Sequence, residues 1–256
     1  MSQSDSITKH ELSALLADLT RSFEAKLASV TSEFERRLEQ QRETAIAPPS
    51  GRRAFVVLAG PGQEAVAERL VTLDPQHFAY YPSVFGKFPD QTDNIELGGF
   101  TPINRIRGGH ILFIASFHNN DVSMSQFHAL IALCESFVAS LTILLPFLPT
   151  ATMERVTKEG KVATANTTAK MLSALPSVGT PTRVMLYDLH TLQNRFYFGN
   201  HAVATLHSTF PLLIDIISNA ANCSDTVCFP DDGACKRYGY FFKKAFPHME
   251  LVCLTI

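Results

Sequence analysis

Val184-Met185-Leu186-Tyr187-Asp188-Leu189-His190 joins a continuous apolar run to an acid and a histidine that stand two residues apart. Residues two apart point to the same side of a strand, so we expect both side chains to meet one ligand at the carboxyl end of this strand. Ligands of open α/β sheets bind at that end. The stretch therefore predicts a buried strand that carries a candidate site for a metal ion and its polyphosphate.

Short apolar runs recur before and after this stretch and alternate with segments of helix-like pattern. The expected strands lie at 54–58, 111–115, 141–145, 184–187, 226–229 and 251–256. The expected helices lie near 63–72, 124–138, 162–174, 207–220 and 234–245. Continuous apolar strands that alternate with helices are typical of a parallel sheet covered on both faces. The sequence therefore predicts an α/β fold.

The first 50 residues differ from the rest in composition. Residues 10–44 contain neither Gly nor Pro and are followed by the Pro-rich segment 47–51, so we expect one long helix and then a linker. Apolar residues recur every eleven positions, as at Leu12, Phe23 and Phe34, which is typical of a nearly straight apolar stripe. Two interpretations stay open: the stripe self-associates as a coiled coil, or it packs against its own globular domain.

Composition argues against several classes of protein. With 256 residues, of which 46% are hydrophobic, the chain can bury a sizeable core. A net charge of −2 leaves no basic field for nucleic acid or for an anionic membrane surface. No secretory signal opens the chain, no apolar run reaches the roughly 18 residues of a membrane span, and the five cysteines form no CxxC pair. We expect a cytoplasmic protein with free thiols and with neither nucleic acid nor membrane as a partner.

Two further motifs accompany the first: Gly86-Lys87-Phe88-Pro89-Asp90 upstream, and Phe229-Pro230-Asp231-Asp232-Gly233-Ala234-Cys235-Lys236-Arg237 downstream. The set resembles ribose-phosphate pyrophosphokinases, and it is most similar to their plant-type branch because residues 145–150, 152–157 and 159–165 also fit. The resemblance covers roughly residues 54 to 256. It implies a helix and linker over 1–50, a phosphoribosyltransferase-like domain over 51–200, and a second, truncated one over 201–256.

The resemblance implies an enzyme of nucleotide biosynthesis that moves the pyrophosphoryl group of ATP to the 1-hydroxyl of ribose 5-phosphate, with Mg²⁺ as cofactor. Such a transfer depends on charge neutralisation and in-line positioning. Asp188 and His190 match the family's metal and phosphate positions. The alternative from the residues alone is that Asp188 caps a helix and His190 packs in a turn. Gly199 and Asn200 stand where many relatives have an acid, so we expect metal binding to be weaker or more dependent on the nucleotide.

Phe88, Asp90 and Glu96 match a loop that, in relatives, crosses a subunit boundary and packs on the adenine of ATP. The resemblance therefore also implies a homo-oligomer, or a hetero-oligomer with related subunits. The alternative from the residues alone is an ordinary Pro-Asp turn over Phe88–Gln91.

Residues 150–161 match the family's mobile catalytic flap, but they lack the arginine-glutamine pair of the commoner enzymes. The resemblance leaves Arg155, Lys158 and Lys161 to contact the phosphates, and it includes Glu154 among the cofactor-binding residues. The alternative is a solvated, charged loop.

The downstream motif stands at a strand end that opens a helix. With the resemblance, we expect Asp231 to bind ribose hydroxyls, and Lys236 or Arg237 to face phosphate beside the helix N-terminus. Asp232 is included among the expected cofactor-binding residues. The alternative is a plain N-cap and turn made by the two acids and the following glycine.

In the family, the second half continues into a strand ending in two acids and a small-residue loop whose backbone amides cradle the ribose 5-phosphate. Residues 1–256 contain no segment of that description, so we expect the donor side of the site without the main part of the acceptor side. Three interpretations stay open. The chain is a non-catalytic nucleotide-binding or regulatory partner subunit, a truncated form of an active enzyme, or an enzyme that borrows the loop from another chain.

Overall fold

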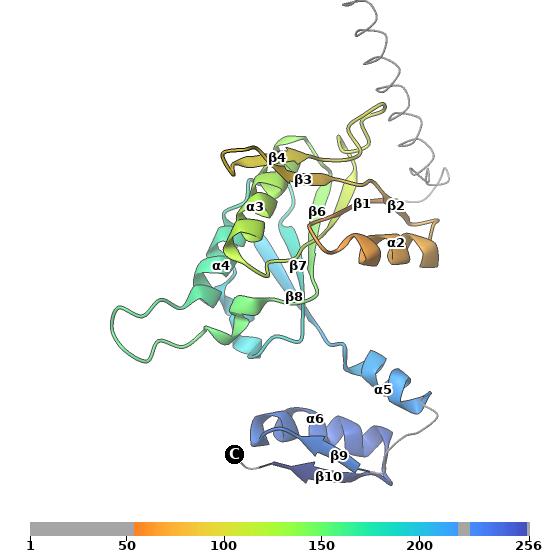
Figure 1. Ribbon diagram of the computed structural model, residues 1–256, viewed down its shortest axis with the longest axis vertical. Helices are drawn as coiled ribbons and strands as arrows, with labels where there is room; N and C mark the ends of the chain where they lie inside the picture. Colours follow the sequence, from red (N-terminus) through yellow and green to blue (C-terminus); the bar gives the residue numbers. More distant parts are fainter. Residues whose placement is uncertain (1–53, 220–225, 255–256) are drawn as a thin grey trace, which may run out of the picture.

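The computed structural model describes residues 54–219 and 226–254 (Figure 1). The helix expected over 10–44 and the linker after it lie outside these residues, as does Cys223. The described chain forms a six-stranded parallel sheet with helices on both faces, followed by a smaller unit that has its own core.

The large sheet has the strand order β2-β1-β5-β6-β7-β8, and every neighbouring pair is parallel. Its strands are β1 (Phe55–Ala59), β2 (Phe78–Tyr80), β5 (His110–Ile114), β6 (Ser140–Leu145), β7 (Thr182–Tyr187) and β8 (Ala202–His207). Strands β1, β5 and β6 are mostly buried, whereas alternate residues of β7 are partly exposed. This burial explains the continuous apolar runs of the central strands.

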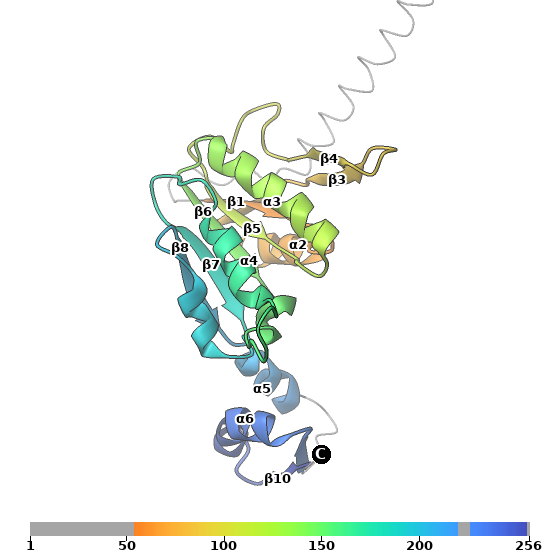
Figure 2. The same ribbon diagram turned by 90° about the vertical axis from the view of Figure 1, so that its left-hand side faces the viewer.

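Successive residues of the strands pack on opposite faces of the sheet. Side chains such as Phe113 and Ile143 face α3 (Asn120–Glu135) and α4 (Thr164–Ser173), whereas Val57 and Leu112 face α2 (Glu64–Leu73). Figures 1 and 2 show α3 and α4 together on one face and α2 on the other. Among the described residues, none of the helices has both the length and the apolar character that crossing a membrane requires.

A smaller unit follows β8. It comprises α5 (Phe210–Ser218), β9 (Thr226–Phe229), α6 (Asp232–Ala245) and β10 (Glu250–Cys253). β9 and β10 are parallel and in register over four residue pairs, and α6 connects them. A separate hydrophobic core holds this unit together, and its buried members are Phe229, Phe242, Phe246 and Met249.

Three short elements complete the chain. The antiparallel hairpin of β3 (Val84–Lys87) and β4 (Asp93–Glu96) precedes β5. Two 3₁₀ turns, η1 (Pro149–Thr152) and η2 (Leu192–Tyr197), follow β6 and β7. Both turns therefore stand at the carboxyl end of the sheet, where ligands of such folds bind.

The expected α/β fold with a mainly parallel sheet is confirmed, and the expected strands and helices are present with ends shifted by a few residues. Helix α3 begins at Asn120 rather than near 124, because the Asn119 side chain accepts a hydrogen bond from Val122 N at 2.9 Å and caps it. The sequence pattern misses β2, β3, β4 and β8, which are short or only half buried. β8 pairs with β7, so the large sheet extends beyond residue 200, where the first expected domain ends. The expected division into domains stays a prediction.

Replacing Ile143 with alanine will lower the free energy of unfolding by about 2–5 kcal/mol, because this β6 side chain is fully buried and its loss leaves a cavity. Ile103→Ala is the matched control, since Ile103 is 59% exposed, and its effect should stay within about 0.5 kcal/mol. Urea unfolding followed by circular dichroism gives both values. Equal losses in the two variants would contradict the placement of β6 in the core.

Candidate functional site

A cavity of about 230 Å³ lies where β6 and β7 end. Its wall combines residues that follow β6, the last residue of β7 with the residues after it, and one arginine from α6: Phe147, Leu148, Ala151, Thr152, Tyr187, Asp188, Leu189, His190 and Arg237. Two hollows of about 380 and 490 Å³ share residues with it, the first Asp188 and the second His190 and Arg237. Ligand pockets usually measure roughly 300–1,000 Å³, so a nucleotide-sized ligand would extend from the cavity into these hollows.

The chain turns sharply at Asp188. Strand β7 ends at Tyr187, and Asp188 has a φ of 45°, in the left-handed region that few residues other than glycine adopt. The expectation that Asp188 and His190 share one side of a strand is therefore wrong, because both residues follow the strand. They nevertheless line the same cavity, since the turn keeps both at the end of β7.

The Asp188 carboxylate is anchored to the start of α5. Its Oδ1 accepts a hydrogen bond from Ser208 Oγ at 2.9 Å, and its Oδ2 accepts from Thr209 N at 3.0 Å and from the Thr209 hydroxyl. Partial burial alone would raise the pKa of Asp188, but these hydrogen bonds and the charge of Arg237 outweigh it, so the pKa lies below its ordinary value. Asp188 therefore binds the first residues of α5, which agrees with the alternative that it caps a helix. The same residue also lines the cavity.

Glu154 is almost fully buried beside His190, with a side chain that is 8% exposed. Its Oε1 lies 3.9 Å from His190 Nε2 and 3.3 Å from Arg155 Nε. Its Oε2 is buried and has no hydrogen-bond partner among the described residues. An unpaired buried carboxylate oxygen is costly, so this position favours an additional cation or donor.

The resemblance implies magnesium, and the carboxylates present are of the kind that this ion binds. Magnesium is bound through one or two carboxylates, with water and phosphate oxygens in the rest of its shell. Asp188 offers a carboxylate on the cavity wall, and Glu154 has a free oxygen beside His190. Within 54–219 and 226–254, no three His, Cys, Asp or Glu side chains are grouped so that they could hold a metal ion. Oxygen atoms of a ligand or of water would therefore have to complete the coordination of such an ion.

Of the four residues expected at the start of α6, only Arg237 reaches the cavity. Arg237 Nη1 donates a hydrogen bond to the His190 carbonyl at 3.2 Å, which joins α6 to the turn after β7. Asp231 Oδ1 accepts a hydrogen bond from Ala234 N at 2.8 Å. Asp231 is therefore the N-cap of α6, as the alternative from the residues alone has it. Asp232 and Lys236 form an ion pair with each other on the surface.

The basic residues of the expected flap are exposed. Residues 153–163 form a loop between η1 and α4, which Figure 1 shows projecting from the body. Arg155, Lys158 and Lys161 are all exposed, and none of them lines the cavity. Because Ala151 and Thr152 of the neighbouring η1 do line it, the loop begins at the rim of the cavity.

Phe88, Asp90 and Glu96 belong to the β3–β4 hairpin, which Figures 1 and 2 place beside α3 and far from α5 and α6. Gln91 N donates to the Phe88 carbonyl at 2.9 Å, so the expected Pro-Asp turn is present. The side chain of Thr92 donates to Asp90 Oδ1 at 2.6 Å, which holds the pKa of Asp90 below its usual range. None of the three expected residues lines the cavity of its own chain.

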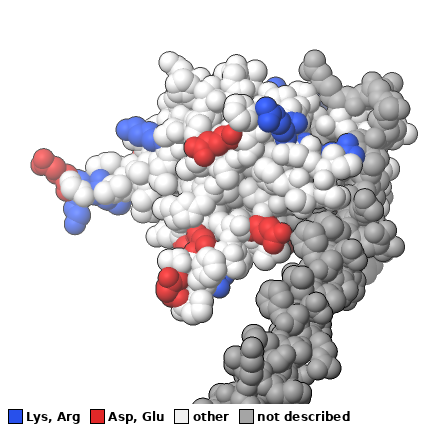
Figure 3. Space-filling view, turned by 90° about the horizontal axis from the view of Figure 1, so that it is seen from above, with Lys and Arg blue, Asp and Glu red and all other residues white. Residues whose placement is uncertain are grey.

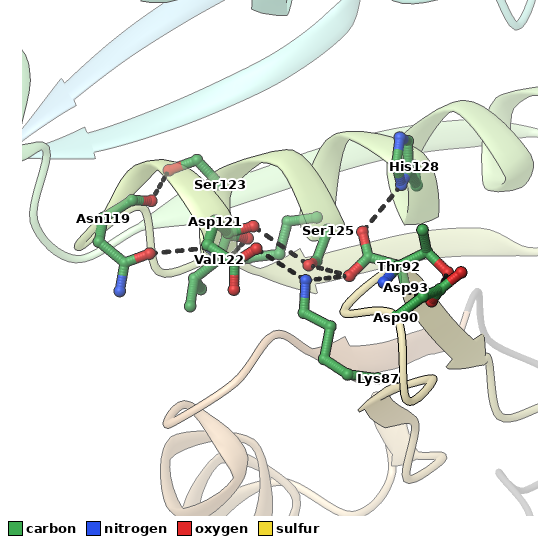
Figure 4. A network of polar contacts seen from close by, with 11 residues as sticks. Lys87, Asp90, Thr92, Asp93, Asn119, Asp121, Val122, Ser123, Ser125 and His128 are labelled. Atoms are coloured by element: carbon green, nitrogen blue, oxygen red, sulfur yellow. Dashed lines mark hydrogen bonds and ion pairs between the residues drawn. The ribbon is translucent and has the colours of Figure 1, made fainter.

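Charged contacts fasten this hairpin to α3 (Figure 4). Lys87 Nζ lies 2.6 Å from Asp93 Oδ1 and 2.7 Å from Asp121 Oδ1, where it joins both strands of the hairpin to the first turn of α3. Asp93 also accepts a hydrogen bond from Ser125 Oγ at 2.7 Å and contacts His128 Nδ1 at 3.0 Å. The direction in which the hairpin tip points is therefore fixed relative to the sheet.

Sequence reasoning missed two residues that shape the site, Thr209 and Asn194. Thr209 holds the Asp188 carboxylate, as described above. Asn194 is 3% exposed, and its Nδ2 donates to the Ala151 carbonyl at 2.9 Å, which ties η2 to η1 at the cavity rim. Threonine and asparagine are common in turns, so neither residue carries a sequence signal that marks it for this role.

The surface charge is mixed. Figure 3 shows acidic and basic side chains interspersed on one face of the described residues, with uncharged surface between them. This distribution agrees with the small net charge of −2. On that face, the described residues do not gather their cations into a single basic field.

Replacing Asp188 with asparagine will reduce stability at neutral pH and much less in acid. The native carboxylate has a lowered pKa, so its contribution is present above the ordinary carboxyl pKa of about 4 and is lost as the pH falls through the lower native value. Urea unfolding of both proteins from pH 7 downward gives the difference in unfolding free energy. A difference that stays constant across this range would contradict the ionic role of Asp188.

Comparisons with known proteins give the chain clear relatives, although no model of a known protein family matches it. Ribose-phosphate pyrophosphokinase 4 of Oryza sativa subsp. japonica is 46% identical over 135 residues, which cover 52% of this chain and 42% of the relative. Ribose-phosphate pyrophosphokinase 4 of Arabidopsis thaliana is 36% identical over 189 residues, 73% of this chain and 54% of the relative. This chain thus spans about half, or less, of the length of these relatives.

A further relative, named ribose-phosphate pyrophosphokinase 3, chloroplastic, from Arabidopsis thaliana, is 43% identical over 150 residues, 58% of this chain and 36% of the relative. Since its name places it in an organelle, a cytoplasmic location for this chain stays a prediction. The crystal structure of phosphoribosylpyrophosphate synthetase from Mycobacterium smegmatis has the same fold, with a TM-score of 0.63 and 20% identity over 78% of this chain and 63% of that one. The expected resemblance is therefore confirmed: over the part that it spans, this chain is related to the ribose-phosphate pyrophosphokinases, on their plant-type branch.

Proposed function

We propose that this chain forms the nucleotide side of a ribose-phosphate pyrophosphokinase, a transferase that moves the diphosphate of Mg-ATP to the 1-hydroxyl of ribose 5-phosphate. The observation that carries the proposal is the convergence of Asp188, His190 and Arg237 on one cavity at the carboxyl end of a parallel sheet. A metal–polyphosphate ligand needs both signs of charge, a carboxylate for the metal and a guanidinium for phosphate oxygens. The names of the relatives support the choice of substrates.

Each polar residue at the cavity has a separate task in this proposal. Magnesium, when bound with the nucleotide, neutralises phosphate charge and aligns the phosphates. Asp188 would hold it from the cavity wall. Glu154 does not line the cavity, but its carboxylate would add negative charge beside His190. Imidazole is a poorer ligand for magnesium than a carboxylate, so His190 is better suited to donate a hydrogen bond to a phosphate oxygen. Arg237 would contact phosphate with its planar fork of donors.

In the proposed reaction, the ribose 1-hydroxyl oxygen bonds to the β-phosphorus of ATP while the bond from that phosphorus to the α,β-bridging oxygen breaks. The hydroxyl gives up its proton, and AMP leaves with the bridging oxygen. The protein contributes positioning and charge rather than covalent chemistry. Arg155, Lys158 and Lys161 stand exposed on a loop at the cavity rim, so closure of this loop would add their charges to the phosphates.

The adenine contact would come from a neighbouring subunit. Phe88 and Asp90 lie on a hairpin that Lys87 and Asp93 fasten to α3, away from the cavity of the same chain. Phe88 is 48% exposed, as a ring available for stacking must be. We therefore include a homo-oligomer, or a hetero-oligomer with related subunits, in the proposal.

AMP formation from ATP and magnesium tests the proposal, measured with and without ribose 5-phosphate on the full chain. AMP that depends on ribose 5-phosphate is the result expected of the enzyme, and it would mean that the acceptor side of the site is completed as well. Replacing Asp188 with asparagine together with His190→Ala should lower the rate at least about 100-fold, because each charged contact contributes about 1.5–3 kcal/mol. Asp74→Asn with His77→Ala is the matched control, since this acid and histidine contact each other at 2.7 Å at the end of α2, outside the cavity, and the rate should not change.

Binding of Mg-ATP, measured by calorimetry on the same variants, separates the outcomes. One outcome is that the native chain binds Mg-ATP but forms no AMP, and that the double replacement abolishes this binding. That outcome would contradict catalysis by this chain and favour a nucleotide-binding partner subunit. Binding that survives the double replacement would remove the cavity as the nucleotide site.

A further inference from the structure

Two cysteines lie where α6 packs on β10, and neither lines the cavity. Cys235 lies in the first turns of α6, and Cys253 is the last residue of β10. Both are partly exposed and neither is in a disulfide. Along β10, Leu251 and Cys253 are the more buried alternate residues, so both point toward α6, where Cys235 packs against the same core as Leu251.

Gly239 lets α6 lie close to β10. It stands four residues after Cys235 on the same side of the helix and is buried. A Cβ atom at position 239 would lie 3.8 Å from Cys235 Sγ and 3.8 Å from Leu251 Cδ1, so the helix meets the strand here with only a small residue between them. Burial raises the pKa of Cys253, and a side-chain contact with the neighbouring Cys235 thiol raises it further.

We propose that Cys235 and Cys253 form a reversible disulfide that links α6 to β10. The reactant is a small-molecule or protein disulfide. A thiolate of the pair attacks one sulfur of that disulfide, which releases one thiol and leaves a mixed disulfide. The second cysteine then attacks the mixed disulfide, the S–S bond between Cys235 and Cys253 forms, and a second thiol leaves. The two protein thiols are oxidised, the reactant disulfide is reduced to two thiols, and the two protons pass to those products.

The other described cysteines have different surroundings. Cys228 is exposed on β9, where it alternates with the core residues Val227 and Phe229, whereas Cys253 shares the more buried side of β10 with Leu251. Cys134 is 6% exposed in the core of the large sheet, and burial raises its pKa to about 11. A thiol that is so buried and so weakly ionised reacts slowly with disulfides.

The disulfide would act on the part of α6 that carries charged side chains. Cys235 directly precedes Lys236 and Arg237, and Arg237 donates to the His190 carbonyl at 3.2 Å. A covalent link from this turn to β10 restrains the first turns of α6 against its neighbouring strand. We therefore expect the oxidised protein to resist proteolysis within residues 229–253 more than the reduced protein does.

The test is to treat the reduced full chain with oxidised glutathione, block the remaining thiols by alkylation and map the peptides by mass spectrometry. We expect a peptide pair linked through Cys235 and Cys253, with neither of these two thiols left free, and reversal by dithiothreitol. The link should vanish in Cys235→Ser and in Cys253→Ser, and it should persist in the matched control Cys228→Ser.

Three results would overturn the proposal. One is glutathione attached singly to either cysteine without a link between them. Another is a link that joins either cysteine to Cys223 or Cys228 instead. The third is five free thiols after oxidation, because partly exposed neighbouring thiols that do not react are not a disulfide site.

Discussion

The hydrogen bonds from Ser208 and Thr209 to the Asp188 carboxylate connect the end of β7 to the start of α5, and the shape of the site depends on them. Asp188 has a positive φ, a conformation that persists in a residue other than glycine only where the surroundings hold it in place. The same carboxylate lines the cavity. A carboxylate has about four acceptor positions, of which three are used here, so it can hold the turn and still face a cation.

The groups that suit a polyphosphate come from separate parts of the molecule. Asp188 and Asn194 are fixed by hydrogen bonds at the end of the sheet. Arg237 comes from the small unit, and the basic residues of 153–163 are exposed on a loop. Ion pairs fasten the hairpin that carries Phe88 to α3, away from the cavity of the same chain. This separation of the groups is consistent with the proposed function, in which a bound ligand, closure of the loop and the hairpin of a second chain together complete the site.

Much of the fold could be predicted because the central strands are buried on both faces and therefore have continuous apolar sequences. Strand β8 and the β3–β4 hairpin could not, since their residues are half exposed and resemble loops. The motif at Asp188 and His190 predicted a site at the end of β7, but it could not predict which residues contact Asp188. Those contacts depend on Ser208 and Thr209, twenty and twenty-one residues later in the chain, which only the parallel pairing of β8 with β7 brings to the same edge.

In the proposed function, the turn after β7 and the start of α6 form one nucleotide site. Hydrogen–deuterium exchange of the full chain, with and without a magnesium complex of a non-hydrolysable ATP analogue, can test this arrangement. Peptides covering 187–194 and 229–237 should become protected together, because Asp188, His190 and Arg237 share the cavity. Protection confined to other segments, or of only one of these two, would contradict it.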